Sequence, residues 1–277
     1  MDIIDAHLHF AAEAYFDRIA LAAGHENNAP HLQAAYREYG IVGGVAMGGN
    51  CPPSLEKGAY PPFLKYCLGL DEATLRNPTP ELPFIARHLA KKECLGLKLY
   101  PGYIPFYIYD DFMAPIYELA AACDKPVAVH TGLTASGEGF LKYCHPRIMD
   151  EAATKFPKVR FVMCHLGEPW FEDAVAVLEK NHNVSADLSG ILEGKIPDMA
   201  AFLRQKRFYV EQMQGWLAYL DDYSRLMFGT DWPLANLQDY IEFTKAVIPE
   251  EHWPAVFADN AERIYRCGFT VTKEEQT

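Results

Sequence analysis

Short apolar runs that end in polar or glycine-containing turns recur along the whole chain. These runs predict strands at Ile3 to His9, Ile41 to Met47, Tyr66 to Leu70, Cys94 to Tyr100, Val127 to His130, Val159 to His165, Val184 to Leu188 and Arg225 to Thr230. They are continuous apolar stretches rather than alternating ones, which is typical of strands that are buried on both faces. The pattern therefore predicts a sheet in the interior of the molecule.

Stretches with helical spacing of apolar residues lie between these runs. They predict helices at Leu32 to Tyr39, Leu82 to Lys92, Phe112 to Cys123, Arg147 to Phe156, Phe171 to Asn181 and Leu237 to Val247, further helix within Phe202 to Leu220, and a closing helix at Trp253 to Arg266. Alternating strands and helices imply parallel strands with right-handed crossovers. Eight such units in 277 residues predict one α/β domain, residues 1–277, folded as a closed (β/α)₈ TIM barrel.

Two long excursions follow predicted strands. The segment 48–62 is rich in proline and glycine, and the segment 190–223 separates the seventh and eighth strands. Loops after strands lie at the C-terminal face of a barrel, where active sites are built. We therefore expect extended loops that cover a site at this face.

Charge and cysteine content narrow the class of protein. The net charge of −12 argues against nucleic acid or an anionic membrane as the main partner. No apolar run is long enough to span a bilayer, and no signal peptide is recognisable. The seven cysteines form no C-x-x-C pair, which favours a reducing cytoplasm over a disulfide framework. We expect a cytoplasmic protein that acts on a small molecule, and an assembly of two copies remains open.

The first predicted strand carries the motif Asp5-x-His7-x-His9. Successive side chains of a strand point to opposite faces, so these three are expected to project the same way. Two imidazoles held side by side at a strand end can bind a divalent metal ion. The alternative is a core strand with two incidental histidines.

Other predicted strands also end in residues that can bind metal. His130 ends the fifth strand, His165 the sixth, and Asp231 follows the eighth. The carboxyl ends of parallel barrel strands converge on one rim, so we expect these residues to meet His7 and His9 there. A single histidine at a strand end is often only a hydrogen-bonding partner, but the joint occurrence of all five residues favours a metal site.

This arrangement resembles the amidohydrolase superfamily. Further similar motifs are Gly96-Leu-Lys98-Leu-Tyr-Pro101, Phe228-Gly-Thr-Asp231-Trp-Pro233 and Asn260-Ala-Glu-Arg-Ile264, which resemble its branch of small hydrolases and decarboxylases, aminocarboxymuconate semialdehyde decarboxylase among them. The resemblance implies one divalent ion, Zn²⁺ in the first place with Mn²⁺ as the alternative. It implies that His7, His9, His130 and Asp231 bind this ion, and that His165 polarises the substrate or assists proton transfer.

Such a ligand set suits hydrolysis of a small amide, ester or lactone. It leaves a position for water, and zinc lowers the pKa of bound water to about 7. Asp231 would accept the proton of that water and later deliver it to the leaving group, while His165 would bind the oxygen that becomes negative. The alternative is nonoxidative decarboxylation of a small aromatic or enoic acid. A barrel that binds a ligand without catalysis is disfavoured because every expected ligand residue is present.

Lys98 and Asp5 have several interpretations. Lys98 lies where binuclear relatives in the superfamily carry a carbamylated lysine between two metals. It is otherwise expected to pair with a substrate carboxylate or with a protein carboxylate such as Asp231. Asp5 is expected to stand behind the ligands as a second carboxylate that orients an imidazole.

Five further residues are expected near the site only because they lie at or just after the ends of predicted strands. Tyr100, Glu168 and Trp170 follow strands four and six and are candidates for substrate contacts, with ordinary packing as the alternative. Asp187 and Ser189 end strand seven and are candidates to contact the substrate or to brace His165.

Overall fold

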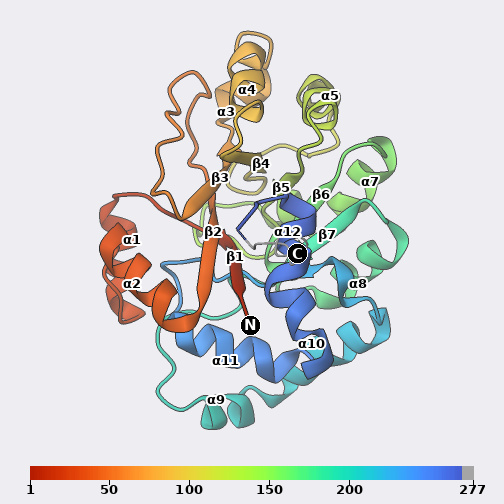
Figure 1. Ribbon diagram of the computed structural model, residues 1–277. Coiled ribbons are helices and arrows are strands. Elements are labelled where there is room, and N and C mark those ends of the chain that lie inside the picture. Colours follow the sequence, from red (N-terminus) through yellow and green to blue (C-terminus); the bar gives the residue numbers. More distant parts are fainter. Residues whose placement is uncertain (270–277) are drawn as a thin grey trace, which may run out of the picture.

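A computed structural model describes residues 1–269 as an eight-stranded barrel surrounded by helices (Figure 1). The strands follow one another in chain order, and each is parallel to the next. Their bounds are β1 Ile3–Leu8, β2 Ile41–Met47, β3 Leu64–Gly69, β4 Cys94–Leu99, β5 Val127–Val129, β6 Phe161–Met163, β7 Val184–Asp187 and β8 Leu226–Met227. The predicted (β/α)₈ barrel is confirmed. Residues 270–277 of the predicted domain 1–277 lie outside the described residues.

Backbone hydrogen bonds join the first strand to the segment that follows the last one. The Ala6 N–H donates to the Phe228 carbonyl at 2.9 Å, and the His9 N–H donates to the Trp232 carbonyl at 2.6 Å. The sheet is therefore closed on itself, and the ends of β1 and β8 are neighbours.

Helices occupy every long predicted helical stretch. They are α1 Ala14–Ala22, α2 Ala29–Tyr39, α3 Glu72–Arg76, α4 Leu82–Leu89, α5 Ala114–Ala122, α6 Leu141–Cys144, α7 Ile148–Lys155, α8 Phe171–Lys180, α9 Met199–Gln205, α10 Arg207–Leu220, α11 Leu237–Val247 and α12 Asn260–Tyr265, with a π-helical turn at Ala255–Asp259 before α12. The pattern did not predict α1, α3 and α6. No described helix is long and apolar enough to cross a membrane.

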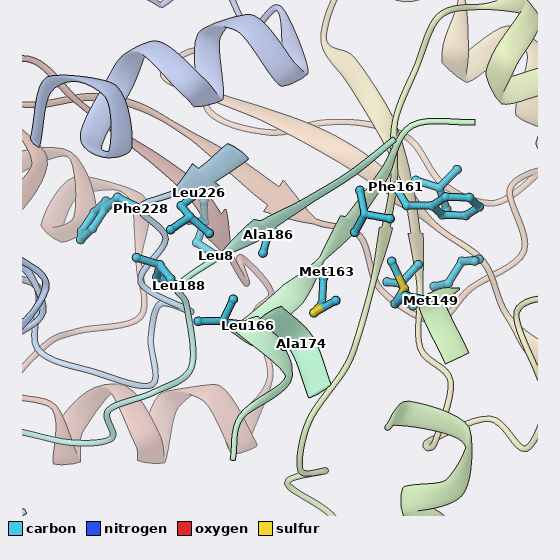
Figure 2. Close-up of a cluster of buried hydrophobic side chains, with 14 of the residues drawn as sticks. Leu8, Met149, Phe161, Met163, Leu166, Ala174, Ala186, Leu188, Leu226 and Phe228 are labelled. Carbon is cyan, nitrogen blue, oxygen red and sulfur yellow. The ribbon is translucent and has the colours of Figure 1, made fainter. Parts of the chain in front are cut away.

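The buried apolar side chains form two layers. The outer layer lies between strands and helices, and Figure 2 shows part of it, including Leu8, Ala186 and Phe228. The inner layer fills the barrel and includes Ile4 and Ala6 together with residues of α12. The backbone carbonyl of Ile264 in α12 accepts a hydrogen bond from Arg160, which precedes β6, so α12 covers the amino-terminal end of the strands. The opposite end is left for the site.

The side chains of β1 do not alternate regularly between the two faces of the sheet. This corrects the expectation that Asp5, His7 and His9 all project the same way. Ile4 and Ala6 belong to the inner layer, but Leu8 belongs to the outer one, because the register of β1 against β2 shifts between Asp5 and Leu8. Asp5 therefore does not share a face with His7. Its carboxylate accepts hydrogen bonds from the Tyr36 hydroxyl of α2 at 2.9 Å and from the Thr230 hydroxyl at 2.6 Å.

Strands β6 and β8 end two and three residues earlier than predicted because the chain turns sharply at the rim. His165 lies in a short turn, Cys164–Gly167, rather than in β6, and its φ is +64°. Asp231 lies four residues beyond β8 and has a φ of +55°. Such left-handed φ values are uncommon for residues other than glycine and are concentrated at functional sites.

Candidate metal centre

Three of the predicted ligands meet where β1 and β8 end. His7 Nε2 lies 3.4 Å from Asp231 Oδ1, and His9 Nε2 lies 3.3 Å from the same oxygen. Ligand atoms of these three residues lie within 4.8 Å of one another. A separation of this size allows several donors to reach one ion.

Several buried polar atoms of the predicted ligands have no hydrogen-bond partner, including one of His130, which lies outside the cluster of His7, His9 and Asp231. Among the described residues, the buried side-chain atoms without a partner include His7 Nε2, His130 Nε2 and Asp231 Oδ1. Buried polar atoms are nearly always paired, so unpaired ones require an explanation. Two imidazole nitrogens and a carboxylate oxygen are the donors that zinc and similar ions prefer. The residues present thus fit a divalent metal ion.

Behind these atoms lies a buried hydrogen-bond network. Asp187 Oδ2 lies 2.9 Å from His7 Nδ1, and Ser189 Oγ lies 2.9 Å from His165 Nδ1. The Ser189 hydroxyl donates to Asp187 Oδ1 at 2.5 Å. His165 Nε2 in turn lies 3.2 Å from His130 Nδ1. The network connects strands one, five, six and seven of the barrel.

A second cluster of potential ligands, His7, His165 and Asp187, belongs to this network. Unlike the first cluster, this one has nitrogen atoms that already form hydrogen bonds. His7 Nδ1 is bonded to Asp187, and His165 Nδ1 is bonded to Ser189. The second cluster is therefore a supporting structure for the imidazoles.

The electrostatics of the site favour neutral imidazoles and ionised carboxylates. Burial and the nearby Lys98 lower the pKa of His7 to about 4, and burial and His165 hold the pKa of His130 well below its ordinary value. Burial alone would raise the pKa of Asp231, but His9, His165 and His7 hold it well below its ordinary range. Neutral imidazole and ionised carboxylate are the forms that bind metal.

Gly190, after β7, allows the backbone to approach the site closely. Its φ is +67°, and a Cβ atom there would lie 2.6 Å from His165 Nδ1 and 3.2 Å from Asp231 Oδ2. Any side chain would therefore displace both residues.

Lys98 is fully buried, and its ammonium group donates to Cys164 Sγ at 3.0 Å. Within the described part of the chain it forms no ion pair, so the expected pairing with Asp231 is absent. The Nζ atom also lies 5.2 Å from the centre of the Tyr100 ring. The lysine is thus held beneath the site by a thiol and an aromatic ring.

Aromatic rings form a wall around His9. Phe16 of α1 stacks on the His9 ring with centroids 5.6 Å apart, and Tyr100 does so at 6.4 Å. The Tyr100 hydroxyl donates to the Gly48 carbonyl at 2.6 Å, which fixes the ring. The tyrosine was expected near a substrate, whereas Phe16 belongs to a helix that the apolar pattern did not predict.

Glu168 and Trp170 contact residues other than the candidate metal ligands. The Glu168 carboxylate accepts a hydrogen bond from the Tyr209 hydroxyl of α10 at 3.2 Å, and burial raises the pKa of Glu168. The Trp170 ring lies 4.6 Å from that of His145. The structure brings neither into hydrogen-bonding contact with the metal-facing atoms.

The principal residue that sequence reasoning did not place is Asp187. Its position at the end of a strand suggested a brace for His165, but its contact with His7, 180 residues away along the chain, is set by barrel closure. The only signal in the sequence is a carboxylate that ends an apolar strand.

A closed parallel barrel with imidazoles and carboxylates gathered at its strand ends is the architecture of a barrel metalloenzyme. The family model described as amidohydrolase matches residues 4–267, and the chain belongs to this family. The chain is therefore an enzyme of the amidohydrolase superfamily, as its motifs predicted. No curated protein matches it significantly in a sequence comparison.

Solved structures of similar fold cover nearly the whole chain. An uncharacterised TIM-barrel protein from Bordetella bronchiseptica is 21% identical, with a TM-score of 0.71 and coverage of 96% of this chain and 99% of that one. A putative 2-pyrone-4,6-dicarboxylic acid hydrolase from Pseudomonas putida is 16% identical, with a TM-score of 0.64 and coverage of 98% of each chain.

The solved structure of a decarboxylase resembles the fold of this chain to about the same extent. The 5-carboxyvanillate decarboxylase from Novosphingobium aromaticivorans, solved with manganese and 4-hydroxy-3-methoxy-5-nitrobenzoic acid, is 13% identical, with a TM-score of 0.67 and coverage of 96% of each chain. At these identities the likeness establishes the fold. Hydrolases and decarboxylases both use it.

Proposed function

We propose that the protein is a metal-dependent hydrolase of a small amide, ester or lactone. The observation that carries this proposal is the cluster of His7, His9 and Asp231, whose ligand atoms lie within 4.8 Å of one another, together with the lack of a hydrogen-bond partner at His7 Nε2, His130 Nε2 and Asp231 Oδ1. With His9 they would hold one divalent ion. Zinc is our first expectation, and the manganese found with the Novosphingobium decarboxylase supports Mn²⁺ as the alternative.

The ion would supply Lewis acidity, which makes a coordinated water acidic near neutral pH. Asp231 is ionised in this setting and would accept a proton at Oδ2, since Oδ1 is the proposed ligand atom, and then return it to the leaving group. His165, in the turn after β6, would assist this transfer. The rings of Phe16 and Tyr100 would exclude water from one side of the substrate.

Decarboxylation of a small aromatic or enoic acid is the second candidate. The aromatic wall beside His9 favours a planar substrate, and a decarboxylase of planar acids shares the fold over 96% of this chain. In that reaction the same side chains would hold substrate oxygens, and an acid would protonate carbon before carbon dioxide leaves. Lys98, Glu168 and Trp170 remain candidates for contacts with a carboxylate-bearing substrate.

Two measurements on purified protein test these proposals. Elemental analysis without added metal is expected to find one zinc or manganese ion per chain. Incubation with lactones, esters and amides, and in parallel with aromatic and enoic acids under carbon dioxide detection, is expected to separate the two reactions. Protein that holds no ion and gains none from zinc or manganese would contradict both proposed reactions.

We further expect the protein in the cytoplasm, and sedimentation would show whether it forms a homodimer.

A further inference from the structure

Asp187, at the end of β7, reaches two histidines of the candidate centre. Its Oδ2 lies 2.9 Å from His7 Nδ1. Its Oδ1 accepts hydrogen bonds from the Ser189 hydroxyl at 2.5 Å and from the His165 backbone N–H at 3.0 Å. Asp187, His7 and Ser189 are fully buried. One carboxylate thus contacts side chains or backbone from three strand ends.

The contact with Asp187 determines where the hydrogen of His7 lies. An ionised carboxylate only accepts hydrogen bonds. Asp187 Oδ1 accepts hydrogen bonds from the Ser189 hydroxyl and from the backbone N–H groups of His165 and Ser189, and three donors on one oxygen favour the ionised carboxylate. The hydrogen of His7 is therefore on Nδ1. The lone pair is on Nε2, the atom that has no hydrogen-bond partner.

The same reasoning extends along the network to His130. The single Ser189 hydroxyl hydrogen is given to Asp187, so Ser189 Oγ accepts from His165 Nδ1 at 2.9 Å. The Ser189 carbonyl, 3.2 Å from the same nitrogen, also only accepts. Neutral His165 then carries its lone pair on Nε2 and accepts from His130 Nδ1 at 3.2 Å. The lone pair of His130 is consequently on Nε2, the second unpartnered atom.

We propose that Asp187 is a positioning residue that sets the tautomer and ring orientation of His7 directly, and those of His165 and His130 through Ser189. The inference rests on the proposed metal centre for its purpose. In the protein before metal binds, the unpartnered Nε2 atoms of His7 and His130 both present lone pairs. Partners of this kind orient ligands and strengthen metal binding.

Nitrogen-15 NMR of protein labelled only at histidine, after removal of metal by a chelator, tests the proposal directly. The ring signals report which nitrogen carries the hydrogen, and the His7→Gln and His130→Gln variants assign them. The expected result is hydrogen on Nδ1 of His7, His130 and His165. Hydrogen on Nε2 of His7 in the wild-type protein would overturn the proposal without any need for a variant at Asp187.

Asp187→Asn provides the sharper test because it preserves shape. Oδ1 faces three donors, the Ser189 hydroxyl and the backbone N–H groups of His165 and Ser189, so the amide oxygen will occupy that position. The amide nitrogen then faces His7 Nδ1 and must donate. We expect the hydrogen of His7 to move to Nε2 while His165 is unchanged, and zinc affinity, titrated with zinc alone, to fall about 10- to 100-fold.

Ser189→Ala is the matched control. It leaves the contact between Asp187 and His7 intact, so the His7 tautomer should stay as in the wild-type protein, and any change is expected in the signals of His165 and His130. Unchanged zinc affinity in Asp187→Asn would refute the positioning role and leave the proposed enzyme standing. Conversely, the expected tautomers in a protein that binds neither zinc nor manganese would support the positioning role and remove the proposed function.

Discussion

At the scale of single residues, Asp231 combines a metal-facing oxygen with a strained backbone. Its φ is +55°, its Oδ1 lies 3.4 Å from His7 Nε2 and 3.3 Å from His9 Nε2, and His9, His165 and His7 hold its pKa well below the ordinary range. Gly190 supports this geometry, because a Cβ there would lie 3.2 Å from Asp231 Oδ2. A carboxylate held in this way is suited to carry a proton during turnover.

Replacing this carboxylate tests the role. Asp231→Asn keeps the shape and one oxygen donor but cannot accept and return a proton. We expect metal binding to weaken yet persist, and turnover to fall by about a hundredfold or more. Metal content and kcat, measured once a substrate is found, give the answer. Near-normal turnover would leave Asp231 as a ligand without a role in proton transfer.

His9 offers a second test, because its side chain is 23% exposed and contributes little to the core. His9→Ala removes a proposed ligand while the apolar residues of β1 keep their burial. We expect zinc affinity to fall by more than the roughly 10–100-fold that loss of an outer partner costs. The thermal midpoint and the circular dichroism spectrum of the metal-free protein should stay near wild type. Full metal content and full activity in this variant would show that the ligand assignment on the first strand is wrong.

At the scale of elements, a histidine pair joins helices α2 and α11 beside the site. The first backbone N–H of α11, that of Leu237, donates to His25 Nε2 at 3.2 Å. His25 Nδ1 therefore carries the hydrogen and donates to His31 Nε2 at 3.0 Å. The His25 ring lies 4.5 Å from that of Trp232, the neighbour of Asp231. The start of α11 is thus tied to the segment that carries the site.

This contact predicts a pH dependence of stability. Burial, with His31 and Lys195, lowers the pKa of His25 from 6.5 to about 4. Between these values the unfolded chain binds a proton that the folded protein excludes, so the stability contributed by neutral His25 is lost as pH falls through this window. In His25→Gln the free energy of unfolding should fall less between pH 6.5 and pH 4. Urea titrations across this range measure it.

The exposed His182 supplies the control, since His182→Gln also removes an imidazole but from the surface. If His25→Gln and the wild-type protein lose stability in parallel between pH 6.5 and pH 4, the contact of His25 with the first N–H of α11 does not depend on the charge of His25.

At the scale of the whole molecule, the stability of the barrel depends on the seam between its first and last strands. Asp5 accepts the Thr230 N–H at 2.9 Å and hydroxyl at 2.6 Å, and also the Tyr36 hydroxyl at 2.9 Å. One buried carboxylate therefore links β1, α2 and the segment that leads to Asp231. It holds the seam closed at the point where the candidate ligands emerge.

Asp5→Ala is expected to destabilise the protein by about 3 kcal/mol, because it leaves buried donors of Thr230 and Tyr36 without an acceptor. Thr230→Val removes the hydrogen bond of the hydroxyl to Asp5 and the one it accepts from the Trp232 N–H, and should cost roughly 2 kcal/mol. Denaturant unfolding measures both. A loss in Asp5→Ala no larger than that in Thr230→Val would mean that the carboxylate is not the principal link across the seam.

Much of this architecture was predictable because it depends on local pattern. Continuous apolar runs and helical spacing predicted all eight strands and the long helices, since burial on both faces leaves a periodic mark on the chain. Helices α3 and α6, of five and four residues, were missed because they carry too few apolar positions for a period to stand out, and α1 was missed because it buries only Ala20. The turn that holds His165 was also missed, since two of its left-handed residues, His165 and Leu166, are not glycine.

The sequence by itself determined the barrel and the set of residues at its strand ends, because parallel strands deliver their carboxyl ends to one rim wherever they lie along the chain. Only the tertiary structure decided which partners those residues have. The register shift in β1 turned Asp5 away from His7, closure brought Asp187 to His7, and packing placed Lys98 against Cys164. These outcomes depend on differences of one residue in register and a few ångströms in packing, and an apolar pattern carries no information at that resolution.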